Sequence, residues 1–120
     1  MAKLLWAAPV LPAQDVKATV RFYEEKLGFR ARHQDDEYGI VSRDNVEIHF
    51  WRCDDRHIAE SSSCRLTVEG VDELFERAKE AQIVHPDGDL ELKPWGTREF
   101  PILDPNGNLV WFLEPAKDPA

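Results

Sequence analysis

Residues 93–115 read KPWGTREFPILDPNGNLVWFLEP, and this stretch predicts a β-hairpin near the end of the chain. Its middle, Asp104-Pro105-Asn106-Gly107-Asn108, has the residue types of a tight turn. The flanking runs, 98–103 and 109–113, are rich in strand-forming residues. Both faces of the second run are apolar, so alternation alone does not decide whether Trp111 fills the core or lines a binding surface.

Upstream of this hairpin, the same order of elements is predicted twice. The second half begins with a strand at 63–69 and a helix at 70–81, followed by a short strand at 83–85 or 90–93 and then the hairpin. The first half is predicted to have a strand at 4–11, a helix capped by Asp15 and stopped by Gly28, and strands at 30–33, 38–42 and 46–51. Two βαβββ repeats predict an α+β fold with a curved mixed sheet and helices on its outer face.

We expect one domain over residues 1–120, with modules at 1–52 and 63–115 joined by a polar connector at 53–62. The net charge of −8 disfavours nucleic acid and anionic membranes as partners. The negative charge favours solubility and is also compatible with a cationic small ligand. No apolar stretch approaches the roughly 20 residues of a membrane span, and two cysteines without a CxxC motif fit free thiols in the cytoplasm. The opening MAKLLWAAPVLPA is interpreted as a buried strand, because prolines interrupt any signal-peptide core.

Strand alternation separates core positions from candidate ligand positions. Over 46–51 the alternate residues Val46, Ile48 and Phe50 are all apolar and should pack under a helix, which leaves Glu47, His49 and Trp51 on the other face. The candidate ligand-facing residues are His49, Trp51, Ser63, Arg65 and Trp111, joined by Tyr38 and Trp95 near loops. Tryptophans on such a face can stack on a flat ligand, although a dimer interface or ordinary sheet packing explains them equally well.

The residues provide little for metal or nucleophilic chemistry. The four histidines have no HxH or HxxxH spacing, and only His49, beside Glu47, is a candidate metal ligand. Motifs of serine hydrolases, P-loops and dinucleotide-binding folds are missing from the sequence. We therefore expect no catalytic residue, no bound metal and no cofactor.

Four segments, MAKLLWAAPVLPAQDVKATVRFYEEKLGF, RDNVEIHFW, VEGVDELF and WGTREFPILDPNGNLVWF, together resemble the bleomycin/phleomycin-resistance proteins. These belong to the vicinal-oxygen-chelate superfamily, which includes glyoxalase I and extradiol dioxygenases. The resemblance places the four metal-ligand positions of the superfamily's enzymes at Ala8, His49, Ser63 and Trp111. Only His49 could bind metal, so the resemblance implies a non-catalytic protein that confers resistance by sequestering bleomycin-family glycopeptides.

The resemblance also implies a homodimer with an exchanged N-terminal strand that pivots at Pro9. It assigns Tyr38 and Trp95 to the sandwich around the drug's planar bithiazole, with Asp35 and Asp36 near its cationic tail. Clefts would be shared between subunits and would hold the drug or its metal complex. Arg65 departs from this picture and favours a smaller cleft or a ligand with an anionic or carbonyl group. Another small aromatic ligand, or less favourably a metal-dependent glyoxalase- or dioxygenase-like enzyme, remains the alternative.

Overall fold

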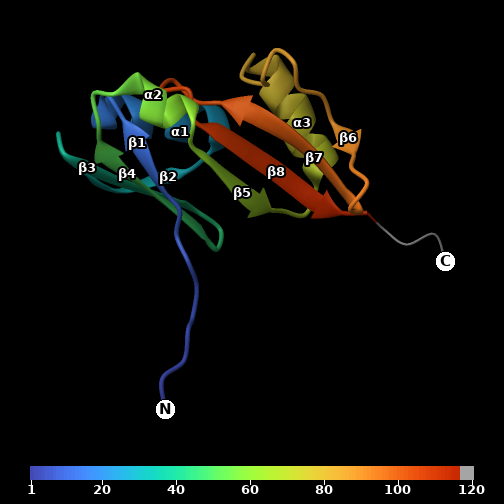
Figure 1. Ribbon diagram of the computed structural model, residues 1–120, viewed down its shortest axis with the longest axis horizontal. Coiled ribbons are helices and arrows are strands. Elements are labelled where there is room, and N and C mark those ends of the chain that lie inside the picture. Colours follow the sequence, from blue (N-terminus) through green and yellow to red (C-terminus); the bar gives the residue numbers. More distant parts are fainter. Residues whose placement is uncertain (117–120) are drawn as a thin grey trace.

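The computed structural model describes residues 1–116, and its elements form two modules of the same order (Figure 1). The first module contains β1 (Val10–Ala13), α1 (Val16–Leu27), β2 (Arg30–Gln34), β3 (Tyr38–Arg43) and β4 (Val46–Arg52). The second contains β5 (Ser63–Thr67), α3 (Val71–Glu80), β6 (Glu91–Leu92), β7 (Thr97–Leu103) and β8 (Leu109–Pro115). The predicted βαβββ repeat is confirmed. Residues 117–120, the end of the predicted single domain, lie outside the described residues.

Each module folds into its own four-stranded mixed sheet. The strand orders are β1-β4-β3-β2 and β5-β8-β7-β6. The pairs β1–β4 and β5–β8 are parallel, and the other neighbours are antiparallel. Helix α1 packs on the first sheet and α3 on the second. One face of each sheet is therefore covered by a helix of its own module, and we call the opposite face the helix-free face.

Local signals set the bounds of α1. The side chain of Asp15 accepts a hydrogen bond from the backbone N–H of Ala18, which caps the first turn. Val16, Val20, Tyr23 and Leu27 recur on one face and are buried. Gly28 then adopts a left-handed conformation with φ of 70° and ends the helix.

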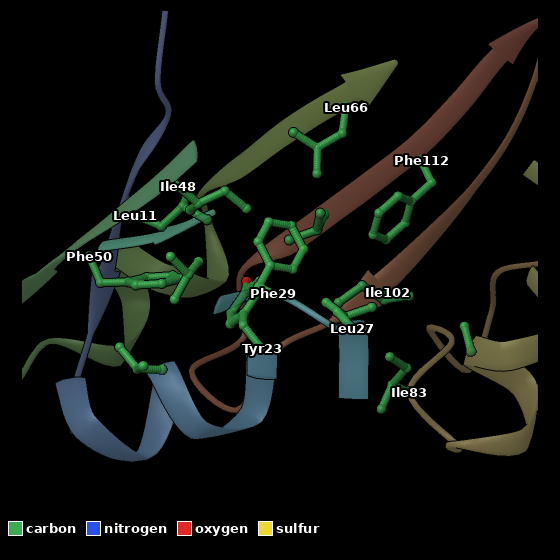
Figure 2. Close-up of a cluster of buried hydrophobic side chains, with 14 of the residues drawn as sticks. Leu11, Tyr23, Leu27, Phe29, Ile48, Phe50, Leu66, Ile83, Ile102 and Phe112 are labelled. Atoms are coloured by element: carbon green, nitrogen blue, oxygen red, sulfur yellow. The ribbon is translucent and has the colours of Figure 1, made fainter. Parts of the chain in front are cut away.

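A single hydrophobic core joins the two modules (Figure 2). From the first module it receives Leu11, Tyr23, Phe29, Ile48 and Phe50, among others, and from the second Leu66, Ile83, Phe100, Ile102 and Phe112. The rings of Phe100 and Phe112 stack with centroids 5.4 Å apart. The helix-packed faces predicted from alternation in β4 are observed, because Ile48 and Phe50 are fully buried.

Buried polar groups of the Asp104–Asn108 turn connect the second module to the first. The hydroxyl of Tyr23 donates to Asp104 Oδ2 at 2.9 Å, and Asn108 Nδ2 donates to the carbonyl of Pro12 at 2.9 Å. Asn106 Nδ2 donates to Thr19 Oγ1 at 3.0 Å. Burial raises the pKa of Asp104, and burial together with the nearby Asp104 raises that of Tyr23 well above its ordinary value. The turn is thus a joint between modules as well as a hairpin turn.

Residues 1–9 form no helix or strand and project away from the body as an N-terminal arm (Figure 1). Leu4, Leu5 and Trp6 on this arm are largely exposed. The carbonyl of Pro9 accepts from the backbone N–H of His49, and strand pairing continues from Val10. The predicted strand at 4–11 is therefore wrong for residues 4–9, which leave β4 at Pro9 and extend away from the sheet (Figure 1).

One further detail differs from expectation, and the structure selects one of two predicted positions for the short strand. The predicted connector at 53–62 contains a short helix, α2 (Arg56–Glu60), capped by Asp55, which accepts from the backbone N–H of His57. Of the two candidates for the short strand, 90–93 contains β6, whereas Val84 makes only an isolated bridge to Ile102.

Within residues 1–116, no helix has the length and apolar character needed to cross a membrane.

The joint between the modules should depend on the Tyr23 hydroxyl. We expect Tyr23→Phe to lower the free energy of unfolding by about 1–2 kcal/mol, because it leaves the buried Asp104 carboxylate short of one donor. Urea denaturation measures this. Tyr38→Phe removes the same hydroxyl at a half-buried site and should cost less. Equal stability of the Tyr23→Phe variant and the unmodified protein would contradict the role of this bond.

Candidate ligand-binding site

Three of the expected site residues lie together on the helix-free face of the first sheet. Tyr38 on β3 is opposite Trp51 on β4, and His49 lies two pairs further along, opposite Ile40. Their neighbours in sequence, Ile48 and Phe50, point to the core. The strand alternation therefore sets which side chains are available to a ligand on this face.

A hydrogen-bonded chain fixes two of these side chains. Glu47 Oε1 lies 2.6 Å from His49 Nε2, and His49 Nδ1 lies 2.7 Å from the hydroxyl of Tyr38. When the imidazole is neutral, Nε2–H donates to Glu47 and Nδ1 accepts from Tyr38. The rings of Tyr38 and His49 meet edge to face with centroids 5.5 Å apart. Both nitrogens of His49 are thus engaged within the protein, and the aromatic surface of Tyr38 is held in place.

The second group lies on the helix-free face of the second sheet, around a carboxylate that the sequence did not single out. Glu99 on β7 is buried, and it accepts two hydrogen bonds from the guanidinium of Arg65 on β5, at 3.1 and 2.9 Å. Trp95 Nε1 and Thr97 Oγ1 also donate to it, at 3.3 and 2.6 Å. Arg65, the leading cause, lowers the pKa of Glu99 from its ordinary value near 4.5 to about 2. Arg65 therefore has an internal counter-ion.

Trp111 lies on the helix-free face of β8, because its neighbours Val110 and Phe112 are buried in the core. It is half-buried and pairs with Arg65 on one side and Pro101 on the other. The ammonium of Lys93 lies 5.7 Å from the centroid of its ring. Trp111 lines a hollow of about 190 Å³ whose rim includes Asp87, Asp89 and Glu91. Trp111 therefore lies outside the core, on the face of β8 that alternation alone could not assign to it.

Asp35 and Asp36, the acidic pair expected to meet the cationic tail of a ligand, make other contacts in the structure. Asp35 accepts from the backbone N–H groups of Glu37 and Tyr38 and contacts the ring of His33, so it organises the β2–β3 turn. The backbone donors lower the pKa of Asp35. Asp36 is exposed and lies 3.6 Å from Lys17 of α1. Its carboxylate is therefore directed toward the helix layer.

The structure brings the expected residues together in two groups, one on each sheet. Tyr38, His49 and Trp51 form the first group, and Arg65, Trp95 and Trp111 form the second. Ser63 lies exposed at the start of β5. Within residues 1–116, neither a hydrogen bond nor an ion pair links the two groups. A larger hollow of about 610 Å³, with Phe29 and Arg43 from the first module and Leu66 and Arg77 from the second among its lining residues, contains none of the expected site residues.

Glu99 is the site residue that sequence reasoning missed. Glu99 is the one acidic residue of β7, and the other face of this strand carries Arg98 and the buried Phe100 and Ile102. A charge facing away from a core can be solvated, so the pattern gives no reason to expect burial. Arg65 was the available signal for a buried acidic residue. It is a cation within a strand, and it has no partner nearby in sequence.

The donor atoms do not fit a divalent metal at the positions that the resemblance marks. Ala8 and Trp111 carry no side-chain atom that donates a lone pair to a metal, and His49 is held by Glu47 and Tyr38. Among residues 1–116, no three His, Cys, Asp or Glu side chains converge as a metal site would require. The arrangement offers aromatic surfaces and fixed charges suited to binding.

The lowered pKa of Glu99 predicts a specific pH dependence. Glu99→Gln should lower the free energy of unfolding at pH 7 by about 1–3 kcal/mol, reduced from the full linkage value because Arg65 is half exposed. The folded-state pKa lies below the unfolded one, so this contribution is present above about pH 4.5 and is lost as the pH falls toward 2. Urea denaturation of both proteins between pH 7 and pH 3 measures it. A stability difference that does not narrow with falling pH would contradict the assignment.

The chain is similar in sequence to curated resistance proteins. A bleomycin resistance protein from Geobacillus stearothermophilus is 34% identical over an alignment of 131 positions, which covers 95% of this chain and 99% of the relative. A bleomycin resistance protein from Klebsiella pneumoniae is 27% identical over 115 residues, 90% of each chain.

Solved structures of bleomycin-binding and bleomycin-resistance proteins are also similar to this chain. The bleomycin-binding protein of bleomycin-producing Streptomyces verticillus, complexed with copper(II)-bleomycin, has a TM-score of 0.84 and 32% identity, covering 98% of this chain and all of that one. A bleomycin resistance determinant encoded on transposon Tn5 has a TM-score of 0.80 and 27% identity, covering 93% of this chain and 98% of that one. Residues 3–112 match the Glyoxalase/Bleomycin resistance protein/Dioxygenase superfamily, and the chain belongs to this superfamily.

Proposed function

We propose that this protein is a dimeric, non-catalytic binding protein that confers resistance by sequestering bleomycin-family glycopeptide antibiotics. The observation that carries the proposal is the match, over nearly the whole of both chains, to a protein solved with copper(II)-bleomycin bound. A second similar structure, 28% identical with a TM-score of 0.80, is a bleomycin-binding protein complexed with bleomycin. The exposed aromatic side chains on both helix-free faces support the same function, since planar ligand rings stack on such surfaces.

The division of the candidate site into two groups supports a dimer. Each group offers one aromatic wall, Tyr38 with Trp51 on the first sheet and Trp95 with Trp111 on the second. A second copy of the chain would place the first group of one subunit opposite the second group of the other. The resulting two clefts at the subunit interface would each enclose a flat ligand between aromatic walls.

The N-terminal arm provides a means of assembly. It is apolar and exposed, and it leaves the body at Pro9, where strand pairing with β4 begins. Apolar surface of this kind is costly in water and marks an interaction site. We infer that the arm is exchanged between subunits with Pro9 as the hinge, because exchange of an identical element is a low-cost route to a dimer.

The charges fit a cationic ligand. The chain has a formal net charge of −8, which attracts cations within the screening distance of about 8 Å at physiological salt. Asp87, Asp89 and Glu91 border the hollow beside Trp111 and are better placed to meet a positively charged ligand tail than Asp36, which lies toward α1. The absence of suitable donors at Ala8 and Trp111 supports binding in preference to metal-dependent chemistry.

Isothermal titration with metal-free and copper(II)-bleomycin tests the proposal. We expect saturable binding with micromolar or tighter affinity and one ligand per chain. Trp95→Ala should weaken binding at least threefold, because a single aromatic stack contributes about 0.5–1.5 kcal/mol beyond its burial. Quenching of tryptophan fluorescence gives an independent readout.

Leu92→Ala is a matched control for Trp95→Ala. Leu92 and Trp95 are both 65% exposed in the same hairpin, but Leu92 pairs with Arg98, whose side chain reaches Asp72 on the helix side. The control should bind as the unmodified protein does. Absence of heat with either form of bleomycin would refute the proposed ligand, and retained binding by Trp95→Ala would remove Trp95 from the site.

Removal of the arm tests the assembly. A variant starting at Pro9 should sediment as a monomer, or as a dimer with at least tenfold weaker association, because it lacks the exposed Leu4, Leu5 and Trp6 side chains. Analytical ultracentrifugation measures this, and circular dichroism checks that the body still folds. A truncated variant that dimerises as tightly as the full chain would show that the arm is not exchanged.

A further inference from the structure

The Glu99 carboxylate makes an unusual number of contacts for one side chain. It is 1% exposed, and its two oxygens accept four hydrogen bonds from Arg65, Trp95 and Thr97. Burying a carboxylate is expensive unless charge and hydrogen bonds compensate, so these donors must stay in place for Glu99 to remain buried. The cluster is therefore a constraint on the positions of its partners.

Trp95 depends on this constraint for its orientation. It lies in the turn between β6 and β7, which is closed by hydrogen bonds from Lys93 N to Thr97 O at 2.8 Å and from Gly96 N to Lys93 O at 2.9 Å. The indole is 65% exposed, and its one polar group donates to Glu99. An exposed indole without such a bond can change rotamer freely. Glu99 thus selects the orientation in which the ring extends from the helix-free face.

Arg65 is held across the sheet by the same carboxylate. Arg65 lies on β5 and Glu99 on β7, and β8 runs between them. In the strand register Arg65 is opposite Trp111, while Glu99 is opposite Leu113. The Arg65 side chain therefore crosses β8 to make its two bonds, and it remains 47% exposed. A planar guanidinium fixed in this way presents a flat surface on which conjugated rings can stack.

We propose that Glu99 is a positioning residue that holds the Trp95 indole and the Arg65 guanidinium as two fixed flat surfaces for a planar, conjugated ring of the ligand. The inference deepens the proposed function and rests on it. Glu99 also neutralises Arg65, so this face is suited to a neutral or cationic heteroaromatic ring and not to an anion. This reverses the preference for an anionic group that Arg65 suggests when it is considered alone.

The first test is a double-mutant cycle on bleomycin affinity. Glu99→Gln keeps the shape of the side chain but leaves one acceptor oxygen, and Trp95→Phe keeps an aromatic ring without the N–H group. Glu99→Gln should weaken bleomycin binding about tenfold when Trp95 is present and less than threefold in the Trp95→Phe background. An equal loss in both backgrounds would overturn the inference, because it would show that Glu99 acts independently of Trp95.

Asp72→Asn is the matched control. Asp72 accepts two hydrogen bonds from Arg98, at 2.6 and 2.8 Å, and Arg98 lies on the opposite face of β7 from Glu99. The control therefore replaces a carboxylate by an amide in another bidentate arginine pair. It should leave bleomycin affinity within twofold of the unmodified protein. A loss as large as that of Glu99→Gln would indicate a general effect on the second module and would count against the proposal.

A second readout needs no ligand. The indole N–H resonance of Trp95 in a ¹H–¹⁵N spectrum, assigned by its loss in Trp95→Phe, should shift and exchange faster with water in Glu99→Gln but not in Asp72→Asn. An unmoved resonance would overturn the positioning role even if bleomycin binds. If the unmodified protein binds no bleomycin, the proposed function fails, and this resonance alone decides whether Glu99 orients Trp95. Glu99→Asp, which keeps the charge but withdraws the carboxylate by one methylene, replaces Glu99→Gln if that variant does not fold.

Discussion

The structure depends on the buried hydrogen bonds through which the Asp104–Asn108 turn reaches the first module. No strand of one sheet pairs with a strand of the other within residues 1–116, so the modules meet through the shared core and through this turn. Asp104 accepts from Tyr23, and Asn108 donates to the carbonyl of Pro12. Buried polar groups are costly when unpaired, which makes this junction specific in a way that apolar packing alone is not. The relative placement of the two helix-free faces follows from it.

Each of those faces uses a carboxylate to hold an aromatic side chain. In the first module Glu47 contacts His49, which contacts Tyr38, and in the second Glu99 accepts directly from Trp95. Flat, rigid rings bury large areas with little loss of side-chain entropy when they are already oriented. In this arrangement acidic groups hold aromatic side chains in place, directly in the case of Trp95 and through His49 in the case of Tyr38. The same anchoring engages both nitrogens of His49 in hydrogen bonds within the protein.

Local sequence signals predicted much of the fold. Asp15 and Gly28 bound α1 through interactions within a few residues, and alternation in β4 separated Ile48 and Phe50 from His49 and Trp51. The features that these local signals missed depend on partners distant in sequence, or lie in segments whose composition fits more than one structure. An apolar run such as 4–8 has the same pattern whether its partner strand belongs to its own chain or to another copy. The polar segment around α2 resembles a loop apart from its Asp55 cap, and two apolar faces left Trp111 unassigned until its neighbours were seen to be buried.

Arg65 shows why the candidate site was harder to predict than the fold. An arginine on a ligand-facing strand position favours an anionic or carbonyl ligand if it is considered alone. Its partner, Glu99, is 34 residues away in sequence and two strands away in the sheet. Once paired with Glu99, the guanidinium is part of a nearly neutral ion pair, so its charge alone no longer gives a reason to expect an anionic ligand. Sequence alternation can place a side chain on a face, but the chemistry of that side chain is decided by partners that only the tertiary structure brings within hydrogen-bonding distance.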